Sequence, residues 1–542
     1  MQKLFYNAKV YVDKGNYQQA VLVEDGNIKA VGSNEEVSLA AHADDQLKKI
    51  DCGGHTLVPG FNDSHMHFMM LGETRNQAQI EGVKSIDEMI GICRKFAEEH
   101  PEVKRKGIHA IGWNQDLFTD SSRLPDRHDM DKISTEFPVV LERICGHIVS
   151  TNTKVLEMLG LPENTHGMKE GDYDLDEEGR PNGIFRGNGC NVAKDLLPDF
   201  TMDERLKILK ETMDYTVSEG VTSVQSNDVG TTFMPGPESF HLFRKMYEDG
   251  AGKLRYRHQV SFNDYDQLEH FFHDGEFVHG DYPEDSWLTL GPLKLFKDGS
   301  LGARTALMTN GYVGDRDNHG LEWMSAGDMD RYCKLAKEHN MQVVTHCIGD
   351  EAVRQTINSY EKAFVDGKNK LRHALIHCQI TDKELIDRIV KDDILVFAQP
   401  IFIDYDMTIV EDLVGKELAS TSYAFGTLIR KGAHVAYGTD CPVEDCNPFP
   451  NIYMAVTRKN KEGKPEGGFY PKECVDVETA VDAYTKESAY GEFMEDKKGR
   501  LKPGYYADMV LLDRDIFTCD PEEIKQIKPL MTVTGGKIVF ER

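Results

Sequence analysis

The sequence has no Cys-x-x-Cys pair and no long hydrophobic run. Its 11 cysteines are scattered and odd in number, so a disulfide framework is not expected and a reducing compartment fits better. No segment approaches the roughly 20 apolar residues that cross a bilayer, and residues 1–20 lack the apolar stretch of a cleavable signal. We therefore expect a cytoplasmic protein that makes no membrane contact.

Positive charge is also scarce. The 542 residues include 63 Lys and Arg against 91 Asp and Glu, a formal net charge of −28. A phosphate backbone would be repelled by such a chain rather than neutralised, so nucleic acid is not an expected partner. Hydrophobic residues make up 40% of the chain, which is enough apolar material for a large core.

Both ends of the chain have the alternating pattern of β-strands. Near the N-terminus "KLFYNAKVYV" and "AVLVEDGNIKAVG" carry a hairpin signal at Asp25-Gly26, and near the C-terminus "ADMVLLDRD" and "LMTVTGGKIVF" carry one at Gly535-Gly536. We expect residues 1–56 and 497–542 to form one composite β-sandwich domain. Two unrelated β-caps are the alternative.

The middle of the chain alternates short apolar strands with amphipathic helical stretches, which is typical of a parallel α/β fold. Eight strands are the number that a closed (β/α)8 TIM-like barrel needs, and we predict such a barrel over residues 57–496. Reaching eight requires a large insertion after barrel strand 1, at about residues 75–200, although "IHAIGW" and "FPVVLERI" inside it also resemble strands. The eight candidates are "TLVPGFNDSHMH", "GVTSVQS", "LRYRHQVSF", "LTLGPLKLF", "MQVVTHC", "HALIHCQI", "ILVFAQP" and "HVAYGTD".

Potential metal ligands stand at the ends of these strands. Side chains alternate along a strand, so His65 and His67 point to the same side, and active sites of such barrels lie at the C-terminal strand ends. Zinc and similar cations bind converging imidazoles and carboxylates. A lone histidine at a strand end is more often a core residue, but four at one rim favour a metal site. The predicted ligands are His65, His67, Lys294, His346, His377 and Asp440.

Lys294 needs a separate explanation. An ammonium beside metal cations is unfavourable, so the amine is expected to lose its proton. A neutral amine can take up carbon dioxide and become an anionic carbamate that bridges two metals. A lysine paired with Asp298 or another carboxylate is the alternative, and the residues alone leave both open. Lys297 is a rival for the bridging role, but it lies in the Asp-Gly turn and on another strand face, so Lys294 is preferred.

The order of these residues resembles the amidohydrolase superfamily. Over nearly all of its length the chain is similar to amidohydrolase family 3, the group that contains N-substituted formamide deformylases. Four segments resemble the long insertion of that family, which supports leaving them out of the barrel: "GWNQDLF", "RLPDRHDMD", "RICGHIVSTN" and "GRPNGIFRG". The remaining family motifs are "VPGFNDSHMHF", "LKLFKDGSLGARTA", "VVTHCIGDEAV", "HCQI", "GTDCPV" and "KKGRLKPGYYADMVLLDRDIF".

The resemblance implies a binuclear metal centre, usually of zinc. By position, His65, His67 and Asp440 would hold one ion and His346 and His377 the other. An N6-carboxylated Lys294 and a hydroxide would bridge the two ions.

The reaction implied is hydrolysis of a non-peptide C–N bond in a small-molecule amide, formamide or N-acyl compound. A metal-bound hydroxide would attack the carbonyl, and Asp440 would act as general base and then general acid. The same site acting on an ester, a lactone or an amidine ring, as in a deaminase, is the alternative activity. A non-enzymatic scaffold would have lost ligands, whereas here every expected position is filled.

Four further residues are candidate substrate contacts. His147 resembles a family position that faces the substrate, and it is also a catalytic candidate because it could hydrogen-bond the carbonyl oxygen; a buried structural histidine is the alternative. Trp113 could line an apolar pocket or belong to a core. Arg304 could meet an anionic group or pair with a nearby acid, and Gln399 points at the rim without an assigned role. A homodimer is the default oligomer.

Overall fold

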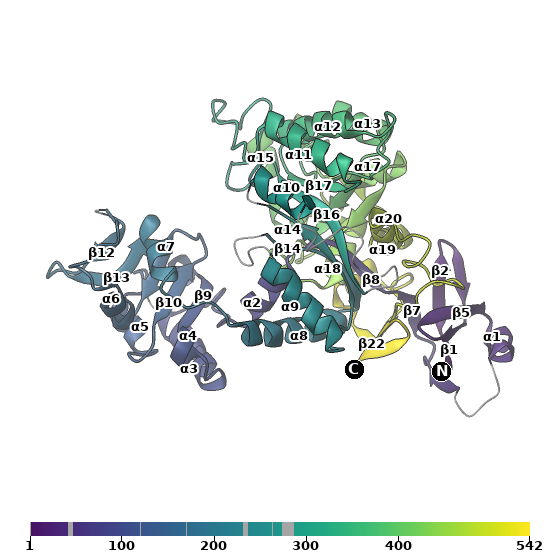
Figure 1. The fold of residues 1–542 in the computed structure, drawn as a ribbon, viewed down its shortest axis with the longest axis horizontal. Helices are drawn as coiled ribbons and strands as arrows, with labels where there is room; N and C mark the ends of the chain where they lie inside the picture. The colour runs from purple at the N-terminus through teal and green to yellow at the C-terminus, as the bar shows by residue number, and fades with distance from the viewer. Residues whose placement is uncertain are drawn as a thin grey trace. The chain divides into compact units, whose positions relative to one another are not determined.

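The computed structural model describes residues 2–41, 47–119, 121–169, 171–230, 237–262, 264–273 and 287–542. The chain divides into two compact units (Figure 1). Unit 1 comprises Met1–Met70 and Lys210–Arg542, and unit 2 comprises Leu71–Leu209. Within the described ranges, every helix is too short or too polar to span a bilayer.

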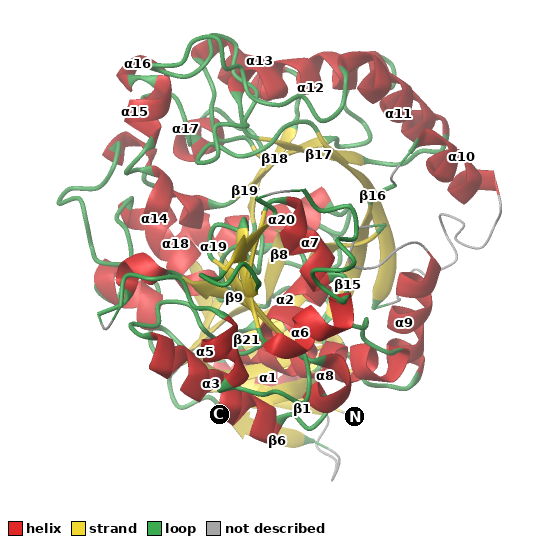
Figure 2. Cartoon of the chain, turned by 90° about the vertical axis from the view of Figure 1, so that its left-hand side faces the viewer, coloured by secondary structure: helices red, strands yellow, loops and turns green. Residues whose placement is uncertain are grey.

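Unit 1 contains an eight-stranded parallel sheet that curves into a barrel, with α10 to α13 along its outside (Figure 2). The segment that follows the last strand meets the end of the first through backbone hydrogen bonds: Asp440 N–H donates to His65 O at 2.9 Å, and His67 N–H donates to Cys441 O at 2.7 Å. The predicted barrel and its order of strands are confirmed. The barrel strands are β8 (Phe61–Met66), β14 (Val221–Val229), β15 (Arg255–Val260), β16 (Leu288–Phe296), β17 (Val343–Cys347), β18 (Ala374–His377), β19 (Leu395–Ala398) and β20 (Val435–Tyr437).

The predicted first strand, residues 56–67, is in fact two strands with different partners. β7 (Thr56–Pro59) pairs with the C-terminal strand β21 (Met509–Leu512), whereas β8 enters the barrel. Gly60 separates them, and a Cβ at this position would lie only 2.0 Å from Thr222 Oγ1. The backbone can come this close to β14 only because residue 60 is glycine.

The two ends of the chain form a β-sandwich. One sheet has the order β5-β4-β1-β6, and the other, β23-β22-β21-β7-β2-β3, joins strands from both termini. Apolar residues of both sheets, among them Phe5, Val21, Leu57 and Met509, share one buried core. The predicted composite sandwich is confirmed. The predicted domain boundaries, 1–56 and 497–542 for the sandwich and 57–496 for the barrel, stay predictions. The other strands are β1 (Gln2–Tyr6), β2 (Lys9–Asp13), β3 (Asn16–Gln18), β4 (Ala20–Glu24), β5 (Asn27–Gly32), β6 (Lys48–Asp51), β22 (Pro529–Thr534) and β23 (Lys537–Glu541).

Unit 2 is the insertion, and it builds a sheet of its own in the order β12-β13-β11-β10-β9. The two strand-like segments that complicated the barrel count are β9 and β10, which pair with each other in parallel. They are therefore strands, but not barrel strands. The elements of this unit are β9 (Ile108–Trp113), β10 (Val139–Arg143), β11 (Ile148–Thr151), β12 (Tyr173–Leu175), β13 (Pro181–Arg186), α3 (Ile86–Glu99), α4 (Val103–Lys106), η1 (Gln115–Leu117), α5 (Arg127–Asp131), α6 (Thr153–Leu159) and α7 (Asn188–Lys194).

Most barrel strands are followed by helices whose apolar sides are buried. In α12, for example, Val353, Ile357 and Tyr360 are buried. The remaining helices are α1 (Asn34–Ala40), α2 (Phe68–Arg75), α8 (Met202–Ser218), α9 (Pro237–Glu248), α10 (Tyr265–His273), α11 (Ala326–Glu338), α12 (Asp350–Ala363), α13 (Lys383–Lys391), η2 (Pro400–Phe402), α14 (Ile403–Asp406), α15 (Val410–Val414), α16 (Lys416–Ala419), α17 (Phe425–Arg430), α18 (Pro448–Thr457), η3 (Pro471–Glu473), α19 (Val477–Ala483), α20 (Lys486–Gly491) and η4 (Pro521–Gln526).

Candidate metal centre

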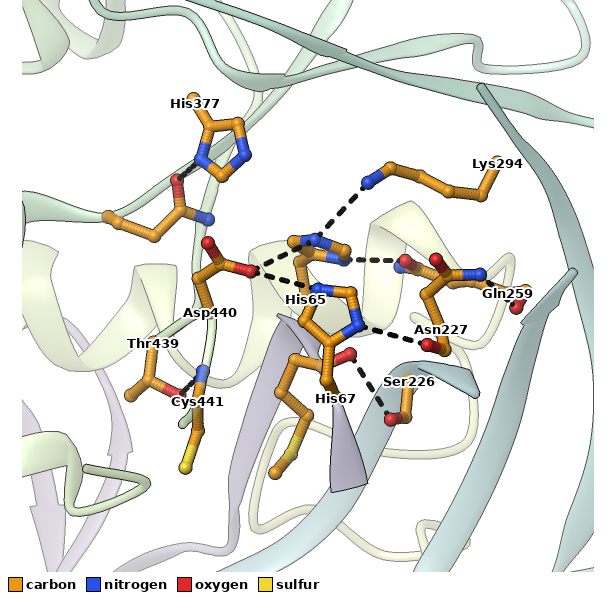
Figure 3. Close-up of polar contacts among 12 residues, drawn as sticks. His65, His67, Ser226, Asn227, Gln259, Lys294, His377, Thr439, Asp440 and Cys441 are labelled. Carbon is orange, nitrogen blue, oxygen red and sulfur yellow. Dashed lines mark hydrogen bonds and ion pairs between the residues drawn. The ribbon is translucent and has the colours of Figure 1, made fainter. Parts of the chain in front are cut away.

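The C-terminal ends of the barrel strands bring the predicted ligands together. Asp440, in the loop after β20, places Oδ1 3.3 Å from His65 Nε2 and 3.3 Å from His67 Nε2. Lys294 Nζ, from β16, lies 3.4 Å from His65 Nε2. Figure 3 shows these side chains and His377 around one space.

The two remaining histidines lie beside each other on the same rim. The ring centroids of His346 and His377 are 4.5 Å apart, and those of His377 and His65 are 5.9 Å apart. Ligand atoms of His65, His377 and Asp440 all lie within 4.8 Å of one another. The structure thus joins all six predicted ligands in one cluster, although their role in binding metal stays a prediction.

Fixed acceptors set the proton position on three of the histidines. His65 Nδ1 contacts Gln259 Oε1 at 2.6 Å, and His377 Nδ1 contacts Gln399 Oε1 at 2.8 Å. His67 Nδ1 contacts the backbone oxygen of Asn227 at 3.0 Å. Since these oxygens only accept hydrogen bonds, each Nδ1 carries the proton and each Nε2 presents a lone pair, as metal-binding histidines require.

The two glutamine amides are themselves held in place, which settles which atom is the oxygen. Gln259 Nε2 donates to Ser64 O at 3.0 Å, and Gln399 Nε2 donates to Phe397 O at 3.1 Å. His346 has the opposite arrangement, because its Nε2 lies 3.1 Å from Gly299 O and therefore donates. This leaves Nδ1 of His346 as its free lone pair.

Three buried acceptors consequently point at one another. The Nε2 atoms of His65 and His67 and Oδ1 of Asp440 carry lone pairs, and Asp440 Oδ1 has no hydrogen-bond donor among the described residues. Without a cation, a second proton on His67 would have to fill this position. Burial lowers the pKa of His67, but the adjacent carboxylate of Asp440 outweighs burial and raises the pKa overall. Two imidazoles and a carboxylate of this kind fit a divalent metal such as zinc.

The environment of Lys294 favours a neutral amine. Burial lowers its pKa from 10.5 to about 7, against the opposing charge of Asp440. Its Nζ lies 4.0 Å from the centroid of the Phe296 ring. Burial also lowers the pKa of His65 to about 3 and that of His346 to about 4, so both imidazoles are neutral at neutral pH, which is the form that can bind a metal.

The alternative partner of Lys294, Asp298, is committed elsewhere. Its carboxylate accepts hydrogen bonds from the backbone N–H groups of Leu307, Ile348 and Gly349 at 2.8–3.0 Å. The rival lysine, Lys297, donates to Glu322 Oε1 and to Met324 O, each at 2.6 Å. Lys294 is therefore the lysine that lies among the histidines.

Asp63 is a buried residue beside the ligand cluster that the sequence patterns missed. Completely buried in β8, it accepts hydrogen bonds from Thr439 Oγ1 at 2.5 Å and from His65 N–H at 3.1 Å. It thereby ties the strand that carries His65 to the segment that carries Asp440. Its place two residues before His65, on the same strand face, was the available signal.

The four candidate substrate contacts have different environments. Trp113 is completely buried in the core of unit 2, where its Nε1 donates to Leu141 O at 2.9 Å, which agrees with the core alternative. His147, also in unit 2, is exposed between β10 and β11 with Nδ1 2.6 Å from Cys145 O, so the buried alternative does not apply. Arg304 is exposed after β16, and Gln399 orients His377. Contact of any of them with substrate stays a prediction.

Comparison with known proteins identifies the amidohydrolase family, which the sequence motifs also resemble. The sequence pattern described as "Amidohydrolase family" matches residues 48–540. The chain is 30% identical to the putative amidohydrolase YtcJ of Bacillus subtilis over 100% of both chains. It is 22% identical to the N-substituted formamide deformylase of Arthrobacter pascens, over 99% of this chain and 97% of that one. An uncharacterized metal-dependent hydrolase from Pyrococcus furiosus has a similar structure, with a TM-score of 0.77 at 26% identity, covering 96% of this chain and 100% of that one.

Proposed function

The chain belongs to the amidohydrolase family and is a metal-dependent hydrolase of carbon–nitrogen bonds, and we propose that it opens a non-peptide amide, formamide or N-acyl bond in a small molecule. The observation that carries this proposal is the convergence of His65 Nε2 and His67 Nε2 on Asp440 Oδ1, each at 3.3 Å, with no hydrogen-bond donor to that buried oxygen among the described residues. A cytoplasmic location and a homodimer, both expected from the sequence, belong to the same proposal.

The proposed centre holds two divalent ions, most simply zinc. His65, His67 and Asp440 would hold one, His346 and His377 the other, and a carboxylated Lys294 would bridge them. When bound, such ions would polarise the scissile carbonyl and lower the pKa of the attacking water. Lys294 suits carboxylation because burial lowers its pKa to about 7, which leaves a large fraction of neutral amine to react with carbon dioxide.

Asp440 has the position of the proton carrier in this reaction. Its carboxylate lies against two histidines and is mostly buried, so water does not compete freely for its oxygens. We propose that it accepts a proton from the attacking water and then donates it to the leaving nitrogen. Amide hydrolysis needs the second transfer because an amide anion is a very poor leaving group.

Replacement of Asp440 tests this role. Asp440→Asn keeps the size and one oxygen of the side chain but takes away the basic group, so we expect kcat to fall by about 10²- to 10⁴-fold in protein loaded with metal. The matched control is Asp412→Asn, because Asp412 is an exposed aspartate on α15, and it should keep wild-type kcat.

The assay uses amides, formamides, esters and lactones of similar size and includes metal analysis of each variant. Asp440→Asn protein that retains both metal and activity within a few-fold of wild type would contradict the proton-carrier role. Wild-type protein that hydrolyses the esters and lactones but none of the amides would contradict the proposed bond.

A further inference from the structure

Trp323 presents a large aromatic surface to solvent beside the proposed metal centre. Its side chain is 60% exposed, although tryptophan is usually well buried. The indole lies parallel to the ring of His346, at an interplanar angle of 3° and with centroids 6.4 Å apart. Small-molecule sites are lined mainly by hydrophobic and aromatic side chains, so an exposed indole beside the proposed centre is placed to contact a ligand.

Hydrogen bonds fix the backbone on both sides of this tryptophan. Trp323 N–H donates to Lys297 O at 3.0 Å, and the buried Nζ of Lys297 donates to Glu322 Oε1 and Met324 O. Two residues before Trp323, Leu321 N–H donates to Thr305 O at 3.0 Å. The indole therefore stands on a rigid segment, so a ligand that binds it loses little free energy in ordering the protein.

Phe296 connects this indole to the reacting groups. The Phe296 ring centroid lies 6.2 Å from that of Trp323 and 5.9 Å from that of His346. Phe296 follows Lys294 by two residues, so both side chains stand on the same face of β16. The aromatic surface made by Phe296 and Trp323 thus runs from Lys294 out to solvent.

We propose that this aromatic surface lines the substrate site and determines its specificity, and that the substrate carries a planar aromatic group next to the scissile C–N bond. The inference rests on the proposed function and deepens it. A flat neutral ring gains both apolar contact and offset stacking from an indole face, and the exposed Leu321 beside it adds apolar surface. A cation on the substrate is the competing occupant, since an indole face also attracts positive charge.

A matched series of substrates tests whether Trp323 contacts an aromatic group of the substrate. Four amides share the acyl group and the scissile bond and differ in the nitrogen substituent, which carries a phenyl, a cyclohexyl, a methyl or a trimethylammonium group. For Trp323→Ala we expect kcat/KM to fall about 10- to 100-fold with the phenyl compound and by less than about 2-fold with the methyl compound. Trp323→Phe should retain most of the phenyl preference, because it keeps a ring.

The control for loss of an exposed apolar side chain is Leu39→Ala. Leu39 is 79% exposed on α1 of the sandwich, and its replacement should leave all four kcat/KM values unchanged. The inference is overturned if Trp323→Ala lowers kcat/KM equally for the four substrates or does not lower it at all. It is also overturned if the wild-type protein prefers the trimethylammonium compound. None of these outcomes affects the proposed hydrolysis.

A binding measurement supplies a readout that does not depend on turnover. The phenyl-bearing amine product is titrated into wild-type protein while tryptophan fluorescence is recorded. We expect a saturable change that is absent in Trp323→Phe and retained in Trp287→Phe, which removes a different tryptophan. A change that persists in Trp323→Phe overturns the inference. If wild type hydrolyses none of the amides, the proposed function fails and this titration alone decides the inference.

Discussion

Replacing Gln259 with methionine tests whether the histidine protons are arranged for metal. Gln259 and His65 are both completely buried, and His65 Nδ1 lies 2.6 Å from Gln259 Oε1. Gln259→Met keeps the length of the side chain but takes away both the acceptor for His65 Nδ1 and the donor to Ser64 O. In metal-free protein the His65 proton can move to Nε2 and donate to Asp440, whose Oδ1 is 3.3 Å away, so the fold tolerates the change.

Metal binding forces that proton back to Nδ1, where the variant offers no partner. A buried donor left unpaired costs about 1–3 kcal/mol, and about 1.4 kcal/mol corresponds to a tenfold change in affinity. We therefore expect Gln259→Met to weaken metal binding by about 5- to 100-fold, in the range usual for partners that orient metal ligands.

The affinity is measured by competition with a chelator of known strength, alongside the thermal midpoint of the metal-free protein. The control is Gln355→Met on α12, where the half-buried Gln355 Nε2 donates to Glu351 Oε1 at 3.0 Å rather than contacting a proposed ligand. Folded Gln259→Met protein that binds metal as tightly as wild type would refute the reasoning.

Three other changes give separate results. Gln399→Met should weaken binding of one ion through His377; a raised KM with unchanged metal affinity would instead identify Gln399 as a substrate contact. Lys294→Ala should lose metal and activity, with partial rescue by short carboxylates, and full activity without them would count against a bridge. Burial raises the pKa of Asp406 from 3.8 to about 6, so unfolding releases a proton between about pH 4 and 6 and the free energy of unfolding falls as pH rises. Asp406→Asn should remove this slope in urea denaturation, and an unchanged slope contradicts the assignment.

Local sequence patterns predict the barrel and the side chains on its rim. Strand periodicity distinguishes Lys294 from Lys297, because side chains alternate along a strand and the two lysines therefore point to opposite faces. The structure agrees, with Lys294 at 3.4 Å from His65 and Lys297 bound to Glu322. The position of Asp440 follows in the same way, from a short apolar strand that ends at a reactive side chain.

The features that were missed depend on contacts between distant segments. Gln259 is the next-to-last residue of β15, and nothing in the local sequence indicates that it contacts His65, 194 positions away. Trp323 lies in a loop without periodicity, so its exposure and its orientation toward His346 are set by Lys297 and Thr305. The break at Gly60 likewise depends on the approach of Thr222. β9 pairs with β10 in parallel, and an alternating pattern predicts that a segment is a strand but not which strand it pairs with.

The most direct test of the account is anomalous diffraction at the zinc absorption edge from crystals of the zinc-loaded protein. We expect two peaks, one bonded at about 2.0–2.2 Å to His65, His67 and Asp440, and the other bonded to His346 and His377, with density for a carboxylated Lys294 between them. Crystals of fully loaded protein with no peak at this rim, or with Asp440 turned away from the ion, would contradict it.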